Sequence, residues 1–271
     1  MSDNQLKDMP FIEHLRELRS RLIKVAFSVL IFSMVSYFFV TDILYYLTLP
    51  FKLYFKDSTL IGTKPGDAFY VQLQLIVFGG LILSLPYSFF QFWSFISPGL
   101  HDSEKKHIIP FVFFATILFL FGALFAYFKV LPIVYEFFSG EYKNIGTVPT
   151  IILGDYLSLT IQFLLLFGIV FEIPLISIIL GKIGILTSKW MKETFRYATV
   201  IIFILAAIFS PPDVVSQMLL AIPLLLLWGI SILLVSFIEN KDIKDSSVTT
   251  KSDKTLVIGS ENNNKYTQIY N

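Results

Sequence analysis

Residues 157–180 read LSLTIQFLLLFGIVFEIPLISIIL, an apolar run interrupted by one charged residue, Glu172. A helix needs about 20 mainly apolar residues to cross the hydrocarbon core of a bilayer, so this run predicts a transmembrane helix. Further apolar runs occupy residues 22–40, 69–92, 108–130, 197–209 and 214–238. We therefore expect an all-α integral membrane protein with six transmembrane helices, the fifth of which is short.

The composition of the chain also indicates a membrane protein. Of its 271 residues, 55% are hydrophobic and 15% are charged, whereas a soluble domain averages about 25% charged residues. The formal net charge is +1 and no basic patch stands out, so nucleic-acid binding is not expected. The chain has no cysteine, which excludes disulfides, zinc–thiolate sites and thiol catalysis.

The distribution of lysine and arginine predicts the orientation of the spans. In the six-span arrangement, all the arginines and most of the lysines lie on one side of the membrane. The positive-inside rule places that side, and with it both termini, in the cytoplasm. We expect an amphipathic N-terminal segment at residues 1–21, a transmembrane domain at 22–238 and a cytoplasmic tail at 239–271. The tail is rich in polar residues, cannot bury a core and is expected to be disordered.

The N-terminal residues 10–22 read PFIEHLRELRSRL, a pattern that predicts an amphipathic helix. Leu15, Leu18 and Leu22 recur at helical spacing. Glu17 and Arg21 form a favourable i,i+4 pair on the polar face. Basic charge beside an apolar stripe suits the membrane surface, so the simplest interpretation of the segment is an interfacial anchor.

The first cytoplasmic loop, residues 92–107, combines aromatic side chains with a carboxylate. Trp93 and Phe95 are typical of aromatic residues at a membrane interface. Glu104, near these aromatics, offers a carboxylate that can hold a guanidinium through two hydrogen bonds. His101, Glu104 and His107 are three residues apart but lack the spacing of a zinc motif, so we expect no metal site.

Glu172 is the unusual residue of the fourth apolar run, because a charged group near the centre of a membrane helix costs about 2.5–3.5 kcal/mol. Pro174 interrupts the helical hydrogen bonds nearby. We expect Glu172 to have a function. The alternative is a structural contact with a polar side chain on a neighbouring helix.

Asp213 and Gln217 lie one helical turn apart, directly after the prolines of residues 210–213 (SPPD). Ser210 and Asp213 have the spacing of a capping box, so the simplest role of Asp213 is to start the last helix. Gln217 is expected to face inward rather than toward lipid. With the other glutamines of the spans, these residues predict a concave bundle with a polar, water-accessible face. The other glutamines are Gln72, Gln74, Gln91 and Gln162.

The chain shows no catalytic constellation. It lacks the motifs GxxxxGK[ST], GxSxG and HExxH. We therefore expect a protein that is not an enzyme and that has no metal and no cofactor.

Four short motifs resemble those of the TatC family, the multispanning subunits of the twin-arginine protein translocase. They are residues 14–22 (HLRELRSRL), residues 95–100 (FISPGL) followed by Glu104, residues 171–174 (FEIP), and residues 210–213 (SPPD) followed by Ser216 and Gln217. The motifs occur in the family's order and with its spacing. One departure is Lys105, which stands where the family pattern has an arginine and preserves the local charge.

The resemblance implies a receptor and core subunit that binds paired-arginine signal peptides and exports folded proteins with the proton-motive force. The implied peptide-binding residues are Glu104, Phe95, Glu17 and Arg19. The implied residues of the intramembrane polar face are Glu172, Asp213 and Gln217. The implied partners are TatA-type and TatB-type single-span subunits, membrane lipid and further copies of the chain. The implied location is a bacterial inner membrane or, for an organelle-encoded chain, a thylakoid or mitochondrial inner membrane.

Two other functions stay open on the residues alone. A proton-coupled small-solute transporter would use Glu172 and Asp213 as proton relays and would move solute without a partner subunit. A scaffold for other membrane complexes would use the polar face only to bind helices. The transporter should have broken helices near the membrane midplane, and the scaffold does not require Phe95 beside Glu104.

Overall fold

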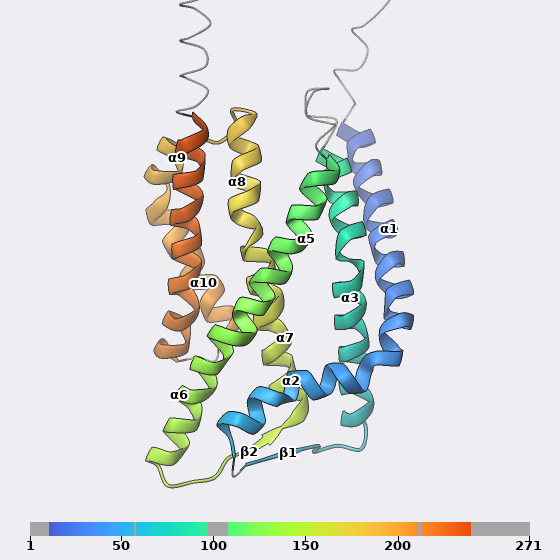
Figure 1. The fold of residues 1–271 in the computed structure, drawn as a ribbon, viewed down its shortest axis with the longest axis vertical. Helices are drawn as coiled ribbons and strands as arrows, with labels where there is room; N and C mark the ends of the chain where they lie inside the picture. Colours follow the sequence, from blue (N-terminus) through green and yellow to red (C-terminus); the bar gives the residue numbers. More distant parts are fainter. Residues whose placement is uncertain (1–10, 57, 97–107, 211–212, 240–271) are drawn as a thin grey trace, which may run out of the picture. The chain divides into compact units, whose positions relative to one another are not determined.

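The computed structural model describes residues 11–56, 58–96, 108–210 and 213–239, and this part of the chain is almost entirely helical (Figure 1). The first elements are α1 (Phe11–Ser36), the 3-10 turn η1 (Tyr37–Phe39), α2 (Val40–Tyr54), β1 (Thr59–Ile61) and α3 (Asp67–Ile96). The middle elements are α5 (Ile108–Phe125), the π-helical segment η3 (Ala126–Val130), α6 (Leu131–Asn144), β2 (Thr150–Ile152) and α7 (Leu153–Val170). The last elements are α8 (Glu172–Lys182), α9 (Ser188–Glu193), α10 (Phe195–Phe209) and a final helix (Val214–Glu239).

Within the described residues, 5 helical stretches are long and apolar enough to cross a membrane. They are Ile12–Tyr54, Asp67–Ile96, Ile109–Asn144, Leu153–Lys182 and Val214–Glu239. The predicted short fifth span corresponds to α10, a shorter apolar helix of 15 residues. The all-α membrane fold is therefore confirmed, whereas the six-span count and the cytoplasmic location of both termini stay predictions.

The chain divides into two compact units. The first comprises Met1–Glu172 and Ile202–Leu224, and the second comprises Ile173–Ile201 and Leu225–Asn271. Within the first unit, α1 continues without interruption through residues 21 and 22, where the sequence analysis separates the N-terminal segment from the transmembrane domain.

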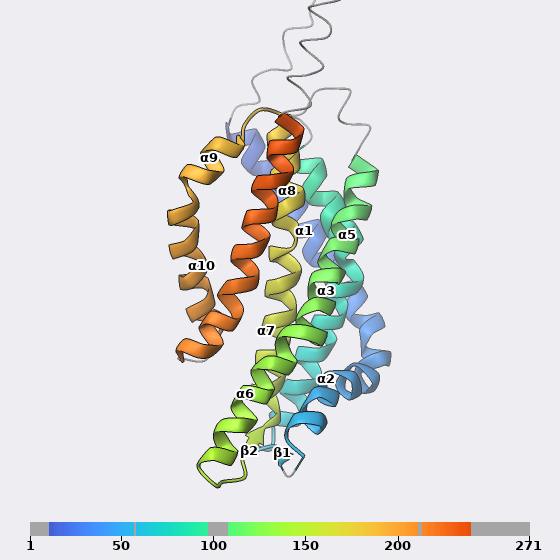
Figure 2. The same ribbon diagram turned by 60° about the vertical axis from the view of Figure 1, so that its left-hand side comes forward.

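In the first unit, α1 lies alongside α3, and α5 packs against both α3 and α7 (Figures 1 and 2). Glycines bring these helices close together. A Cβ added to Gly80 of α3 would lie 2.7 Å from the Cα of Ser33 in α1. A Cβ added to Gly168 of α7 would lie 2.6 Å from the ring of Phe119 in α5. Small residues at helix contacts are how membrane helices approach closely, because apolar lipid supplies no hydrophobic force between them.

The helix α2 turns away from α1 and runs across one end of the first unit (Figure 1). Its buried face includes Leu47 and Phe51, one helical turn apart. Pro50 lies inside the helix and has no N–H, so the carbonyl of Tyr46 lacks its usual helical partner. The hydroxyl of Tyr127 in η3 donates to that carbonyl at 2.6 Å and satisfies it.

A buried tyrosine of α7 fixes the next turn of α2. The hydroxyl of Tyr156 donates to the carbonyl of Leu47 at 2.9 Å and accepts from the N–H of Phe51 at 3.2 Å. The hydroxyl thus contacts both a carbonyl and an N–H of the same turn of α2. The hydroxyls of Tyr135 in α6 and Thr160 in α7 lie 2.7 Å apart, so α2, α6 and α7 are joined at one place.

Several of these elements are absent from the sequence analysis. The predicted apolar runs leave out α6 and, apart from Val40, α2, and the third run ends at Val130, although the helical stretch continues to Asn144. The reason is polarity, because α6 carries Glu136, Glu141 and Lys143 and so falls outside an apolar run. The strands β1 and β2, which pair in parallel, are also too short for a sequence pattern.

The second unit includes α9 and most of the final helix. Met191 of α9 packs with Ile232 and Val235 of the final helix. The N–H of Ser188 donates to Oε1 of Glu239 at 2.9 Å, and the Ser188 hydroxyl donates to the other carboxylate oxygen. Glu239 therefore satisfies the start of α9 and ties it to the end of the final helix.

Candidate functional site

The described residues of the predicted peptide-binding set lie where the N-terminal turns of α1 meet the last turns of α3 (Figure 1). Residues 12–24 and 89–96 are called here the α1/α3 end. Glu17 and Arg19 come from α1, and Phe95 comes from α3. The amphipathic helix expected at the N-terminus is confirmed, and in the structure it is the beginning of α1.

A single guanidinium joins the two helices at the α1/α3 end. Nε and Nη2 of Arg21 donate to Oε1 of Glu17 at 2.9 and 2.5 Å. Nη1 of the same residue donates to Oε1 of Gln91 in α3 at 3.3 Å. The predicted pair of Glu17 and Arg21 is confirmed. The contact with Gln91, which is 6% exposed, was not foreseen.

Phe95 is held by a ring of α1. The imidazole of His14 and the Phe95 ring are stacked, with centroids 4.3 Å apart and planes 18° from parallel. Phe95 is half-buried. Gln91 and Phe95 are one helical turn apart and therefore share the face of α3 that contacts α1.

Arg19 lies on an exposed part of α1 beside an apolar groove. The groove has a volume of about 430 Å³, and its lining is apolar except for Arg19. The lining residues are Leu15, Leu18, Arg19, Leu22, Ile23 and Ala26. The predicted apolar stripe of the N-terminal helix thus forms an open surface.

Glu104 lies outside the described residues, together with the rest of the segment 97–107. The possible metal ligands His101 and His107 lie in the same segment. Within the described residues, no group of three His, Asp or Glu side chains could hold a metal ion.

Trp93 differs from the expectation of an exposed interfacial aromatic. It is 4% exposed, and its ring lies 5.8 Å from that of Phe111 in α5. Trp93 is two residues from both Gln91 and Phe95, which places it on another side of α3. The end of α3 is therefore held by α5 as well as by α1.

Glu172 is buried, with 5% exposure, and its Oε1 has no hydrogen-bond partner in the described part of the chain. It is the first residue of α8, directly after the helix break at Phe171. Pro174 has no N–H to donate to the carbonyl of Val170, where α7 ends, so the predicted interruption of the helix is confirmed.

Asp213 begins the final helix, although in a different capping position from the predicted one. Its Oδ1 accepts the N–H of Ser216 at 2.7 Å, and its Oδ2 accepts the Ser216 hydroxyl. Asp213 is thus itself the N-terminal cap, whereas the predicted capping box gave that place to Ser210. Nε2 of Gln217 donates to the carbonyl of Phe203 at 2.9 Å and joins the final helix to α10.

The glutamines assigned to the concave polar face make separate contacts. Nε2 of Gln74 donates to the hydroxyl of Ser158 in α7 at 3.0 Å, whereas Gln72 and Gln162 are exposed. Among the described residues, no hydrogen bond joins Glu172 to Asp213 or Gln217. A shared function of these residues stays a prediction.

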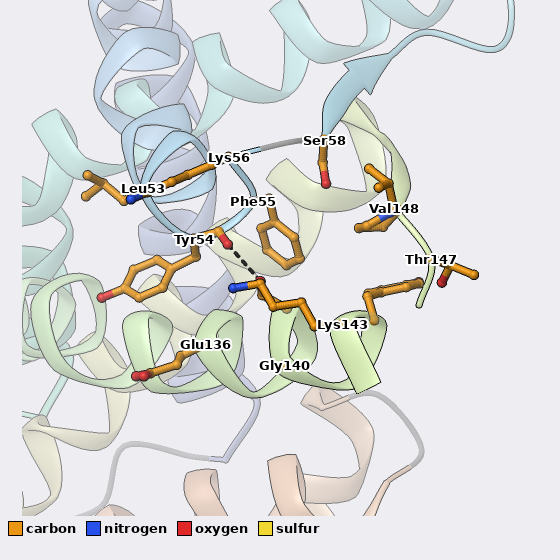
Figure 3. Close-up of a pocket in the computed structure, with 13 residues that line it drawn as sticks. Leu53, Tyr54, Phe55, Lys56, Ser58, Glu136, Gly140, Lys143, Thr147 and Val148 are labelled. Carbon is orange, nitrogen blue, oxygen red and sulfur yellow. Dashed lines mark hydrogen bonds between the residues drawn. The ribbon is translucent and has the colours of Figure 1, made fainter. Parts of the chain in front are cut away.

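A cavity that was not predicted from the sequence (Figure 3) lies among α2, α6 and the strands, at the end of the first unit away from the start of α1 (Figure 1). It measures about 450 Å³ and lies between the end of α2, α6 and the segment before β2. Ser139 donates to the carbonyl of Tyr54 at 2.8 Å across its wall. Lys56, Lys143 and Glu136 bring charges of both signs to the lining.

Comparisons with known proteins agree with the motifs. The family model of Sec-independent protein translocase protein (TatC) matches residues 13–223. A TatC protein of Helicobacter pylori is 36% identical over 247 residues, which cover 89% of this chain and 97% of the relative. A TatC protein of Aquifex aeolicus is 37% identical and covers 83% of this chain and 94% of the relative.

Solved structures give the same result at the level of the fold. A crystal structure of the twin arginine translocase receptor TatC has a TM-score of 0.77 to this chain at 36% identity. The match covers 83% of this chain and 98% of the crystal structure's chain. The family model, the relatives and the fold together show that the chain belongs to the TatC family of Sec-independent protein translocase proteins.

Proposed function

We propose that this chain is the receptor and core subunit of a twin-arginine translocation system, which binds paired-arginine signal peptides and takes part in exporting folded proteins. The observation that carries the proposal is the α1/α3 end, where Arg21 holds the carboxylate of Glu17 and His14 stacks on the ring of Phe95. Phe95 also lies just before the segment that contains Glu104. The relatives named as twin arginine translocase receptor and Sec-independent translocase support the same function.

The chemistry of the site suits arginine. Each guanidinium carries five N–H donors in a rigid fork, and a carboxylate accepts two of them side by side. A lysine presents a point charge without the fork, so a site built from Glu17 and Glu104 should prefer paired arginines to paired lysines. Phe95 can pack against the apolar flank of the peptide.

The remaining assignments belong to the same proposal. Arg19 completes the peptide-binding surface, and Glu172, Asp213 and Gln217 act within the membrane. TatA-type and TatB-type single-span subunits are the partners, and the proton-motive force supplies the energy. The chain is a multi-pass membrane protein. We also propose that it has six spans, cytoplasmic termini and the three-part organisation expected from the sequence. The proposed function includes no enzymatic reaction.

The experiment that tests the receptor role is photo-cross-linking of a paired-arginine signal peptide to the full chain in membranes, with a paired-lysine peptide as control. We expect selective capture of the arginine peptide near Phe95. Glu104→Ala should weaken that peptide's binding by about tenfold or more, because a charge-assisted hydrogen bond contributes about 1.5–3 kcal/mol. Equal labelling by the two peptides would contradict the proposal.

A second variant separates recognition from export. Glu172 is buried and takes part in none of the contacts described at the α1/α3 end. We expect Glu172→Gln to leave peptide affinity within about twofold of wild type, because Gln keeps the shape of the side chain, and to impair export of a folded substrate. A loss of peptide binding as severe as that of Glu104→Ala would show that the residue belongs to the recognition site. Solute flux without partner subunits would instead favour a transporter.

A further inference from the structure

Two contacts hold α1 against α3 at the α1/α3 end, and they lie in register. His14 stacks on Phe95, and Arg21 donates to Gln91. On α1 the two contact residues are two helical turns apart, and on α3 they are one turn apart, so each pair lies on one face. The residue nearer the N-terminus of α1 meets the residue nearer the C-terminus of α3, as antiparallel helices require.

The guanidinium of Arg21 has two roles in this arrangement. It holds Oε1 of Glu17 through two N–H groups, and it reaches across to α3 through a third. Among the described residues, no donor contacts Oε2 of Glu17. One oxygen of the carboxylate is therefore fixed by a resident arginine, while the other is available to an incoming guanidinium.

We propose that Arg21 and Gln91 are positioning residues for signal-peptide recognition. By bridging α1 and α3, they set the register that presents Oε2 of Glu17 and the ring of Phe95 as one surface. Neither residue contacts the peptide in this role. The inference rests on the proposed function and adds to it the device by which two helices present one binding surface.

The contacts of the helix pair elsewhere indicate that this bridge is not needed for folding. The close approach of Gly80 to Ser33 already secures α1 against α3 in the middle of the pair. A single i,i+4 ion pair within one helix, such as the partly buried pair of Glu17 and Arg21, adds little to the stability of that helix. Removal of the bridge should therefore change the register at the α1/α3 end and the affinity for peptide more than the melting temperature.

The test is a double-mutant cycle with Arg21→Met and Gln91→Leu, which remove the donors and the acceptor while keeping side-chain volume. We expect each single variant to weaken binding of a paired-arginine peptide about five- to tenfold, as for one charge-assisted hydrogen bond. In this proposal Gln91 acts only through Arg21. The affinity of the double variant for the peptide should therefore be no lower than that of the single variant with the lower affinity. Losses that multiply would overturn the proposal.

A conservative variant distinguishes positioning from packing. Gln91→Glu keeps an acceptor for Arg21 and should bind the peptide within about twofold of wild type. Arg21→Lys keeps the charge but cannot reach both acceptors with one fork, so it should behave like Arg21→Met. Equal binding by wild type and Arg21→Lys would exclude the bridging role.

A measurement without peptide reports the register directly. The chain has no native cysteine, so His14→Cys with Phe95→Cys provides a single pair for a short bifunctional cross-linker. We expect cross-linking to fall several-fold when Gln91→Leu is added, and unchanged cross-linking would overturn the inference. If cross-linking falls but the wild-type chain binds paired-arginine and paired-lysine peptides equally, the bridge exists and the receptor function fails instead.

Discussion

The two ends of the first unit are held by different means. The end formed by α2, the two strands, α6 and residues 153–160 of α7, called here the α2/α6 end, contains buried hydroxyl contacts of Tyr156, Tyr135 and Thr160. The α1/α3 end has one partly buried ion pair, one hydrogen bond from Arg21 to Gln91 and one stacked ring pair. A buried hydroxyl cannot exchange its partner for water, whereas a partly exposed carboxylate can exchange its partner for a ligand. The α2/α6 end is therefore suited to maintaining shape, and the α1/α3 end to binding.

The largest expected effect on stability comes from a substitution that separates α1 from α3 between the two ends. Gly80→Leu would place a side chain where even a Cβ lies 2.7 Å from the backbone of Ser33, so α1 and α3 must separate. We expect a loss of about 3 kcal/mol of folding free energy, measured by thermal unfolding in detergent, which is the upper end of the about 1–3 kcal/mol that overpacking typically costs. Gly140→Ala is the control, because a Cβ there meets nothing within 4 Å and should leave stability unchanged or slightly higher.

An intermediate effect is expected at the α2/α6 end. Tyr156→Phe removes one hydroxyl and leaves the carbonyl of Leu47 and the N–H of Phe51 without it. We expect a loss of about 0.5–1.5 kcal/mol of stability, the net contribution of a typical intramolecular hydrogen bond, with unchanged peptide affinity. Tyr142→Phe serves as the matched control, because Tyr142 is 38% exposed and should change stability by less than about 0.5 kcal/mol. Equal stability of the two variants would remove the distinction between the ends.

The smallest effect on stability is expected at the α1/α3 end. Glu17→Gln removes one member of an i,i+4 ion pair, which contributes about 0.3–0.5 kcal/mol. The melting temperature should therefore barely change, while binding of a paired-arginine peptide weakens several-fold. Glu193→Gln is the control, because its ion pair with Lys189 has the same spacing on α9 and should affect neither quantity. If the Glu17→Gln variant bound the peptide with wild-type affinity but was less stable, the α1/α3 end would serve stability rather than binding.

The sequence predicts the apolar helices well because their signal is local. Residues 69–92 and 157–180 fall inside helical stretches that are long enough to span a membrane. The break near Glu172 follows from Pro174, which removes a helical hydrogen bond wherever it stands. The pair of Glu17 and Arg21 is likewise set by helical spacing alone.

The contacts between distant segments could not be predicted in this way. Tyr156 meets Leu47 across 109 positions of the chain, and Arg21 meets Gln91 across 70. Gln91 stands out in the sequence only as a polar residue in an apolar run. Nothing in the spacing shows that its acceptor would face an arginine of α1. The burial of Trp93 was missed for a similar reason, since it depends on where α5 lies.

The close approach of Gly80 to Ser33 also has a mechanical side. With no room for a methyl group between the helices, α1 cannot slide along α3 without lifting away from it. We therefore expect a force applied to the first turns of α1 to move α1 and α3 together. Any bending between α1 and α2 is then expected to occur at the 3-10 turn Tyr37–Phe39, where α1 passes into α2.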